Sequence, residues 1–256
     1  MNPQYFFINE DVIEAEGLDI GFSLYSAGHL LWLAAILICG IWLSQWYRRQ
    51  PDDKRRTIRR IFAVVLAVME LVKNAVLVAT GFFSAEYLPF HLCGLAIFAL
   101  LADAFREKLK ISSQMVAYAF MPGAVAALLF CNWTHYPFFN FMNIHSFVFH
   151  GWIFFYFLMR YRAGEIRPVY SGMWKAAAIL VVLVYPLYRF NAAFDTNFMF
   201  LNEASAGSPL VPLWNIFGTR FGHPGYILSV IGLVILVFHA LYTVYRLIEN
   251  KKTVNI

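Results

Sequence analysis

The basic segment "RRQPDDKRRTIRR" occupies residues 48–60 and separates two long apolar stretches, residues 23–46 and 61–83. About 20 predominantly apolar residues let a helix cross the hydrocarbon core of a bilayer. Since both flanks are that long, the pattern predicts two membrane-spanning helices joined by a basic turn. Five further stretches of the same kind follow at residues 87–105, 113–131, 144–160, 171–189 and 226–246.

The composition agrees with lipid as the solvent of this chain. Of its 256 residues, 61% are hydrophobic and 14% are charged, whereas a soluble domain carries roughly 25% charged residues. The seven stretches leave no room for a separate soluble part. We therefore expect one all-α membrane domain over residues 1–256, a bundle of seven transmembrane helices.

The basic residues predict the orientation of this bundle. Of the 20 Lys and Arg residues, 17 lie in alternate connections, within residues 48–60, 106–110, 160–175 and 246–252. Because basic loops stay in the cytoplasm, we expect the N-terminus outside and the C-terminus inside. The chain is then an integral, multi-pass membrane protein, of the cell membrane if it is bacterial. The net charge of +5 is explained by these anchors near anionic lipid, so no nucleic-acid partner is expected.

Three polar side chains are predicted to share one depth in the membrane. His29, Cys93 and His150 each lie six residues past the start of a stretch that runs inward. At a rise of 1.5 Å per residue, six residues place all three about 9 Å below the outer boundary. His91 lies nearer the surface and about 200° around the helix from Cys93, so Cys93 pairs better with a histidine of another helix.

This layer suits nucleophilic chemistry. A thiol attacks an ester carbonyl when a nearby base favours the thiolate, and Cys93 with His150 supplies such a pair. His29 or Asn197 then orients the imidazole or stabilises the oxyanion. The alternative is structural: a membrane-embedded cysteine is often a packing residue, and a buried histidine often makes a structural hydrogen bond.

A deeper polar stripe occurs in "MELVKNAV", residues 69–76. Glu70 and Lys73 are three residues apart, and Glu70 and Asn74 four, so they share one helix face. One interpretation is an internal ion pair that fixes helix packing. The other is a site for a substrate headgroup or a path for protons.

Residues 190–225 form a long outer connection that is rich in phenylalanine. An aromatic segment of this length rests at the membrane interface, or it folds back as a lid over a cavity between helices.

Two classes of function fit these features. The first is a thiol-dependent acyltransferase or hydrolase that acts on acyl esters of membrane phospholipids near the outer leaflet and needs no cofactor. The second is a small-solute transporter or a seven-helix receptor with a polar intramembrane site. The last span contains no lysine, which argues against an opsin-like Schiff base. No metal site is expected, since His145 and His150 are spaced poorly for one ion and lack a carboxylate partner at this depth.

Four blocks resemble the bacterial YwaF-like integral membrane proteins: "LPFHLCG" (88–94), "FVFHGWIF" (147–154), "TNFMFLNE" (196–203) and "FGTRFGHPGYIL" (217–228). In the last block "GTRFGHP" departs from the Gly-Pro-Trp-Pro pattern of that family. The YwaF-like proteins are similar to the eukaryotic transmembrane protein 164 family, which transfers fatty acyl chains onto ether lysophospholipids. The resemblance implies a catalytic cysteine and histidine, and these fall on Cys93 and His150.

Overall fold

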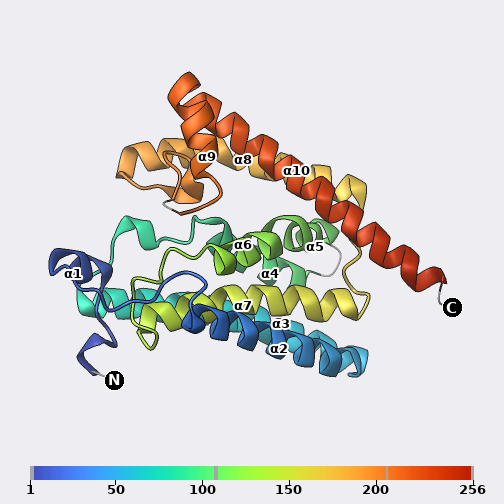
Figure 1. The fold of residues 1–256 in the computed structure, drawn as a ribbon. Helices are drawn as coiled ribbons and strands as arrows, with labels where there is room; N and C mark the ends of the chain where they lie inside the picture. Colours follow the sequence, from blue (N-terminus) through green and yellow to red (C-terminus); the bar gives the residue numbers. More distant parts are fainter. Residues whose placement is uncertain (1–2, 107–108, 206, 255–256) are drawn as a thin grey trace.

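The fold was analysed in a computed structural model that describes residues 3–106, 109–205 and 207–254. Within these ranges the chain contains helices and no strand, and seven helical segments are long and apolar enough to cross a membrane (Figure 1). This confirms the predicted seven-helix class. Six segments contain the long helices α2 (Ala27–Arg48), α3 (Asp52–Thr80), α4 (Leu92–Phe105), α7 (Phe141–Arg162), α8 (Tyr170–Phe194) and α10 (Thr219–Val254).

The seventh segment consists of three consecutive pieces. They are α5 (Lys110–Met115), a π-helical turn η3 (Val116–Phe120) and α6 (Met121–Leu129). Short elements complete the fold: η1 (Pro3–Tyr5), α1 (Glu10–Ala15), η2 (Ala85–Tyr87), η4 (Phe198–Phe200), α9 (Val211–Leu213) and η5 (Trp214–Gly218).

The helix ends differ from the predicted spans where local chemistry extends a helix. Pro51 lies at the N-cap of α3, and Asp52 and Asp53 follow in its first turn, where acidic side chains stabilise the positive helix end. The helix therefore starts nine residues before the apolar stretch. The long outer connection is also shorter than expected, because α8 continues to Phe194 and leaves residues 195–210 between α8 and α9.

Five of the seven segments form most of the packed core, and α8 and α10 add buried residues such as Met173 and Phe238 to it. Helix α2 packs along α7, α3 packs on α4 and α7, and α6 packs on α7. We call the end where α4 and α7 begin the outer end and the opposite one the inner end, following the predicted orientation. Glycines allow α2 and α7 to approach closely, since a Cβ on Gly151 would lie 3.2 Å from Ile36 Cγ1.

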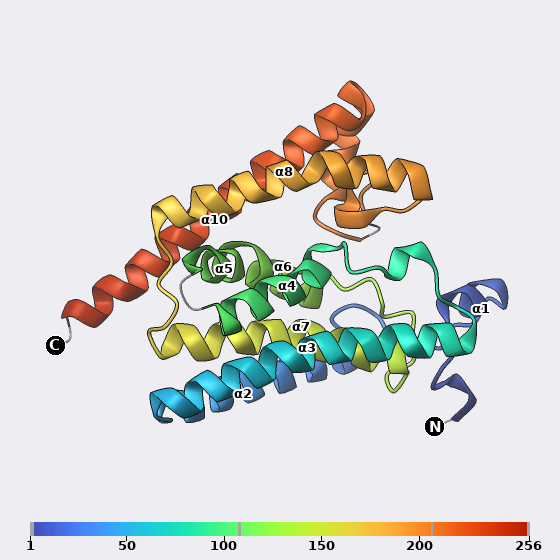
Figure 2. The same ribbon diagram turned by 180° about the vertical axis from the view of Figure 1, so that it is seen from behind.

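Helices α8 and α10 pack on each other and diverge from α4 and α6 toward the outer end in both views (Figures 1 and 2). At the inner end α8 packs on α5, and Tyr245 Oη of α10 donates to Ala117 O at 3.0 Å. In α8 the residues 178–186 are all exposed or half-buried, as are residues 227–237 of α10. The outer halves of these helices therefore present apolar side chains to lipid.

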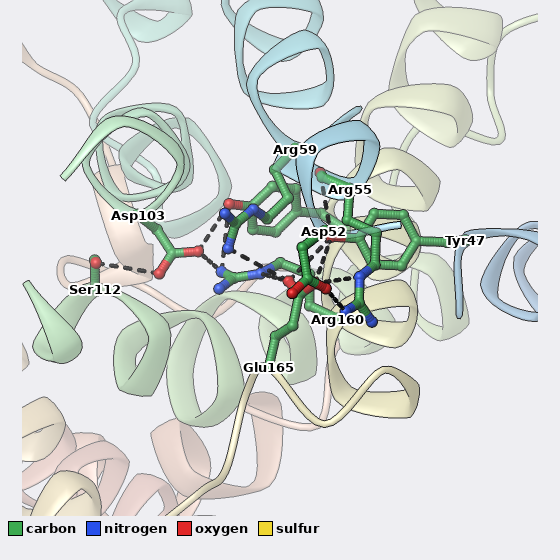
Figure 3. Close-up of polar contacts among 9 residues, drawn as sticks. Tyr47, Asp52, Arg55, Arg59, Asp103, Ser112, Arg160 and Glu165 are labelled. Atoms are coloured by element: carbon green, nitrogen blue, oxygen red, sulfur yellow. Dashed lines mark hydrogen bonds and ion pairs between the residues drawn. The ribbon is translucent and has the colours of Figure 1, made fainter. Parts of the chain in front are cut away.

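The inner end is held together by a buried network of charged residues (Figure 3). Asp103 of α4 and Arg160 of α7 form an ion pair, and each is 5% exposed. Tyr156 Oη donates to Asp103 Oδ2 at 2.7 Å, and Ser112 Oγ donates to Asp103 Oδ1 at 3.3 Å. The carboxylate thus joins three helices, α4, α5 and α7.

Glu165, in the turn between α7 and α8, extends this network to two more helices. Its carboxylate accepts from Arg160 Nε and from Tyr47 Oη, both at 3.0 Å. Arg59 Nη1 of α3 approaches it at 3.4 Å. The sequence alone suggests that these arginines act as anchors at the lipid surface. Arg59 and Arg160 instead face carboxylates inside the bundle, so part of the basic pattern is structural.

We expect Asp103→Asn to destabilise the protein by about 3 kcal/mol, because it leaves Arg160 with less compensation for its buried charge. Denaturant unfolding in detergent measures this free energy. Asp52→Asn is the matched control, since Asp52 also pairs with an arginine, Arg55, but its side chain is 89% exposed. An exposed pair contributes less than about 1 kcal/mol. Equal losses in the two variants would contradict a structural role of the network.

Candidate functional site

The helix that carries Cys93 begins later than the apolar pattern suggests. After η2 the chain turns at residues 88–91, and α4 starts at Leu92 with His91 as its N-cap residue. Pro89 explains the interruption, because proline has no N–H to donate and disfavours helical geometry in the residue before it. Cys93 is therefore the second residue of α4 and lies in its first turn, rather than six residues into a continuous helix.

A close backbone contact fixes this turn. A Cβ on Gly94 would lie 2.7 Å from Pro89 Cα, so the preceding turn folds back on α4 at a position that only glycine permits. Within the described residues, the backbone N–H groups of Leu92, Cys93 and Gly94 have no protein acceptor. Together they make the positive end of the helix, which favours a negative charge beside it.

His150 lies on α7, which contacts α4. Its Nδ1 is 2.7 Å from Ser146 O, so Nδ1 carries the proton and Nε2 keeps its lone pair. The ring stacks on Trp133 with centroids 5.0 Å apart and planes at 12°. No hydrogen bond joins Cys93 Sγ to His150 in the part of the chain that the structure describes. The structure brings the two helices together and leaves Nε2 of His150 as a proton acceptor, but the two side chains are not hydrogen-bonded.

Two residues of the predicted polar stripe on α3, Glu70 and Lys73, form an ion pair. Lys73 Nζ lies 2.7 Å from Glu70 Oε1 and also donates to Tyr87 O at 3.3 Å, and both charged residues are less than 10% exposed. Lys73 also interacts electrostatically with His91 and with His145 of α7. The pair therefore ties α3 to the segment before Cys93 and places a positive charge near two histidines.

Asn74 and His145 each have a buried polar atom that is unpaired. Neither Asn74 Oδ1 nor His145 Nε2 has a hydrogen-bond partner among the described residues. The sequence alone gives no reason to choose His145, because only the packing of α7 on α3 brings it near Lys73.

His91 contacts the connection that follows α8. Met199 N donates to His91 Nδ1 at 3.4 Å, and the rings of Phe198 and Phe200 lie 5.0 and 5.4 Å from the imidazole. Met199 and Phe200 both have φ of 56°, a left-handed conformation that costs energy in residues other than glycine. This connection therefore contacts the start of α4 through His91.

Asn197 organises that connection through side-chain hydrogen bonds to its backbone. Its Oδ1 accepts from the N–H of Asn202 at 3.0 Å and its Nδ2 donates to Glu203 O at 3.0 Å. The fully buried Asn191 side chain also bonds both backbone groups of Phe198.

His29 is fully buried and its two ring nitrogens are both occupied by backbone. Tyr25 N donates to Nδ1 at 2.9 Å, and Nε2 lies 2.8 Å from Leu128 O. Its nearest thiol is Cys131, with Sγ 3.6 Å from Nε2. All three cysteines are free, so Cys93 is not in a disulfide with Cys131.

The N-terminal segment covers the outer end beside Trp133. Asn140 Nδ2 donates to Tyr5 O and to Ile8 O, both at 3.0 Å, and Phe22 N donates to Thr134 O at 2.8 Å. These contacts hold the loop that presents Trp133 to His150.

We expect this cap to loosen in acid. The contact with His135, whose Nε2 lies 3.3 Å from Glu10 Oε2, lowers the pKa of Glu10 below its ordinary value, so the ionised carboxylate favours the docked cap. This contribution is present above the ordinary carboxyl pKa and is lost as the pH falls through the lowered value. Hydrogen exchange of residues 5–16 between pH 3 and pH 6 tests it, with Glu10→Gln as the variant that should lack this dependence. An identical pH profile in both proteins would contradict it.

The model of the TMEM164 family matches residues 24–253, which include all seven candidate spans. No curated protein and no solved structure matches the chain.

Proposed function

Since this integral, multi-pass chain belongs to the TMEM164 family, we propose that it is a thiol-dependent lipid acyltransferase or lipid hydrolase. Its substrates are acyl esters of membrane phospholipids near the outer leaflet. The observation that carries the proposal is the position of Cys93 in the first turn of α4, beside free backbone N–H groups and on a helix that contacts α7.

The first half of the reaction forms a thioester. His150 Nε2 takes the proton of the Cys93 thiol, and the thiolate attacks the carbonyl carbon of the ester. The N–H groups at the start of α4 stabilise the oxyanion of the tetrahedral intermediate. When the C–O bond breaks, the proton on His150 passes to the leaving alkoxide, and a lysolipid departs with a free hydroxyl group.

The second half returns the enzyme to its initial state. The hydroxyl group of an acceptor lysolipid gives its proton to His150 Nε2 and attacks the thioester carbonyl. The C–S bond breaks, and the proton returns to the sulfur. With water as the acceptor the same steps release a fatty acid, so access of water decides between transfer and hydrolysis.

The second candidate is a small-solute transporter or a seven-helix receptor. The buried Glu70–Lys73 pair and the histidines near Lys73 favour it, because ionisable groups inside a membrane often line a substrate or proton path.

One assay separates the two candidates. The purified protein is placed in nanodiscs with phosphatidylcholine that carries a deuterated acyl chain and with an unlabelled lysophospholipid. We expect deuterated acyl chains to appear in the acceptor lipid or as free fatty acid, measured by liquid chromatography and mass spectrometry. Absence of both products would contradict the proposed function, and solute uptake by proteoliposomes would then support the second candidate.

A further inference from the structure

Two arginines lie near the outer end of the bundle, where Lys73, paired with Glu70, is the other Lys or Arg of the described residues. Arg189 is near the outer end of α8, and Arg220 is at the start of α10. Arg220 is exposed, its guanidinium lies 5.4 Å from the ring centroid of Phe221, and the described residues offer it no acceptor. Since basic residues are disfavoured on the outer side, this exposed arginine is a candidate contact for the phosphate of a lipid.

An apolar groove of about 480 Å3 lies next to Arg220 on α10. Its lining residues are Phe217, Phe221, Pro224, Gly225, Leu228 and Ser229. The one hydroxyl among them, Ser229 Oγ, already donates to Tyr226 O at 2.7 Å. The groove therefore offers apolar contacts along the helix and a cation at its outer end.

Two glycines shape this groove. Gly222 has φ of 66° and interrupts the helix, so the chain turns between Phe221 and Pro224. A Cβ on Gly225 would lie 2.4 Å from Phe221 Cβ, so this close approach requires glycine. The backbone thereby holds the Phe221 ring against the first turn after Pro224.

We propose that this groove binds one phospholipid of the surrounding leaflet, with an acyl chain along Phe221 and Leu228 and the phosphate on Arg220. Arginine binds phosphate oxygens in a bidentate manner. The five helical steps from Pro224 to Ser229 rise about 8 Å, which leads from the membrane interface into the acyl region. Binding at this site is separate from the proposed chemistry at Cys93 and does not require it.

Photolabelling tests this site on the full-length protein in nanodiscs of phosphatidylcholine. The probe is phosphatidylglycerol with a diazirine in its acyl chain, and peptide mass spectrometry measures labelling of residues 217–229. We expect excess phosphatidylglycerol to compete and diacylglycerol not to compete. Arg220→Gln should lower labelling about fivefold, the factor expected from one arginine near anionic lipid. Leu228→Trp should fill the groove and lower labelling to a similar extent.

Matched variants control for general lipid contact. Arg189→Gln removes the other outer arginine, and Leu236→Trp changes a side chain of α10 that is 67% exposed, as Leu228 is 68% exposed. Both should label like wild type. Equal competition by diacylglycerol, or wild-type labelling of Arg220→Gln, would overturn the proposal in favour of ordinary lipid contact. A crosslink between two copies of the chain at this groove would overturn it in favour of a dimer interface. Because the readout is binding, none of these results depends on lipid turnover.

Discussion

Replacing Cys93 by alanine should abolish acyl transfer, with a loss of at least about 10,000-fold, because no other group forms the acyl-enzyme. The fold should persist, since Cys93 is half-buried and makes no hydrogen bond among the described residues. Lipid turnover in nanodiscs measures the rate.

Cys39→Ala is the matched control for this variant. Cys39 is an exposed thiol on α2, and its replacement should leave the rate unchanged. Turnover by Cys93→Ala above about one hundredth of wild type would show that the thiol is not the nucleophile.

Replacing His150 by alanine should lower kcat about 1,000-fold, in the range that general acid–base catalysis contributes. The KM for the phospholipid should change little, because the imidazole acts on protons of the reacting groups and not on the lipid chains. The comparison of kcat and KM distinguishes this role from a structural one. A structural loss would reduce the amount of folded protein and leave kcat per folded molecule unchanged.

His239 provides the matched control for His150. Its Nδ1 lies 2.8 Å from Ile235 O, the same contact to the residue four positions earlier that His150 makes with Ser146. His239 lies on α10, and its ring packs on Tyr170 and Trp174. His239→Ala should keep kcat near wild type, and an equal loss in both variants would contradict a catalytic role of His150.

The hydropathy of the chain is sufficient to predict the seven helices, because lipid requires about 20 apolar residues per crossing. It does not locate the start of α4. Pro89 and Gly94 turn the chain there without changing its hydropathy, so a helical residue count from Tyr87 does not describe the path of the chain to Cys93. Counting residues also places His29 at one depth with Cys93 and His150. In the structure, however, both ring nitrogens of His29 contact the backbone of Tyr25 and Leu128.

The network of charged residues at the inner end is a second feature that the sequence does not predict. Asp103 and Arg160 are 57 positions apart and form a buried pair that depends on how α4 packs against α7. No periodic pattern in either segment indicates a partner so far away. The sequence likewise does not indicate that His145 lies near Lys73, because that position follows from the packing of α7 on α3. Local patterns predict the helices here, and tertiary packing decides which polar side chains meet.

The most direct test of the account is to detect the acyl-enzyme on Cys93. The wild-type protein is incubated with phosphatidylcholine in nanodiscs, quenched in acid and examined by intact-mass and peptide mass spectrometry. We predict the mass of one fatty acyl chain on the peptide that contains Cys93, which neutral hydroxylamine removes as it does from a thioester. The adduct should be absent from Cys93→Ala and should form more slowly in His150→Ala. A Cys93 peptide without an adduct in a preparation that turns over lipid would contradict the account.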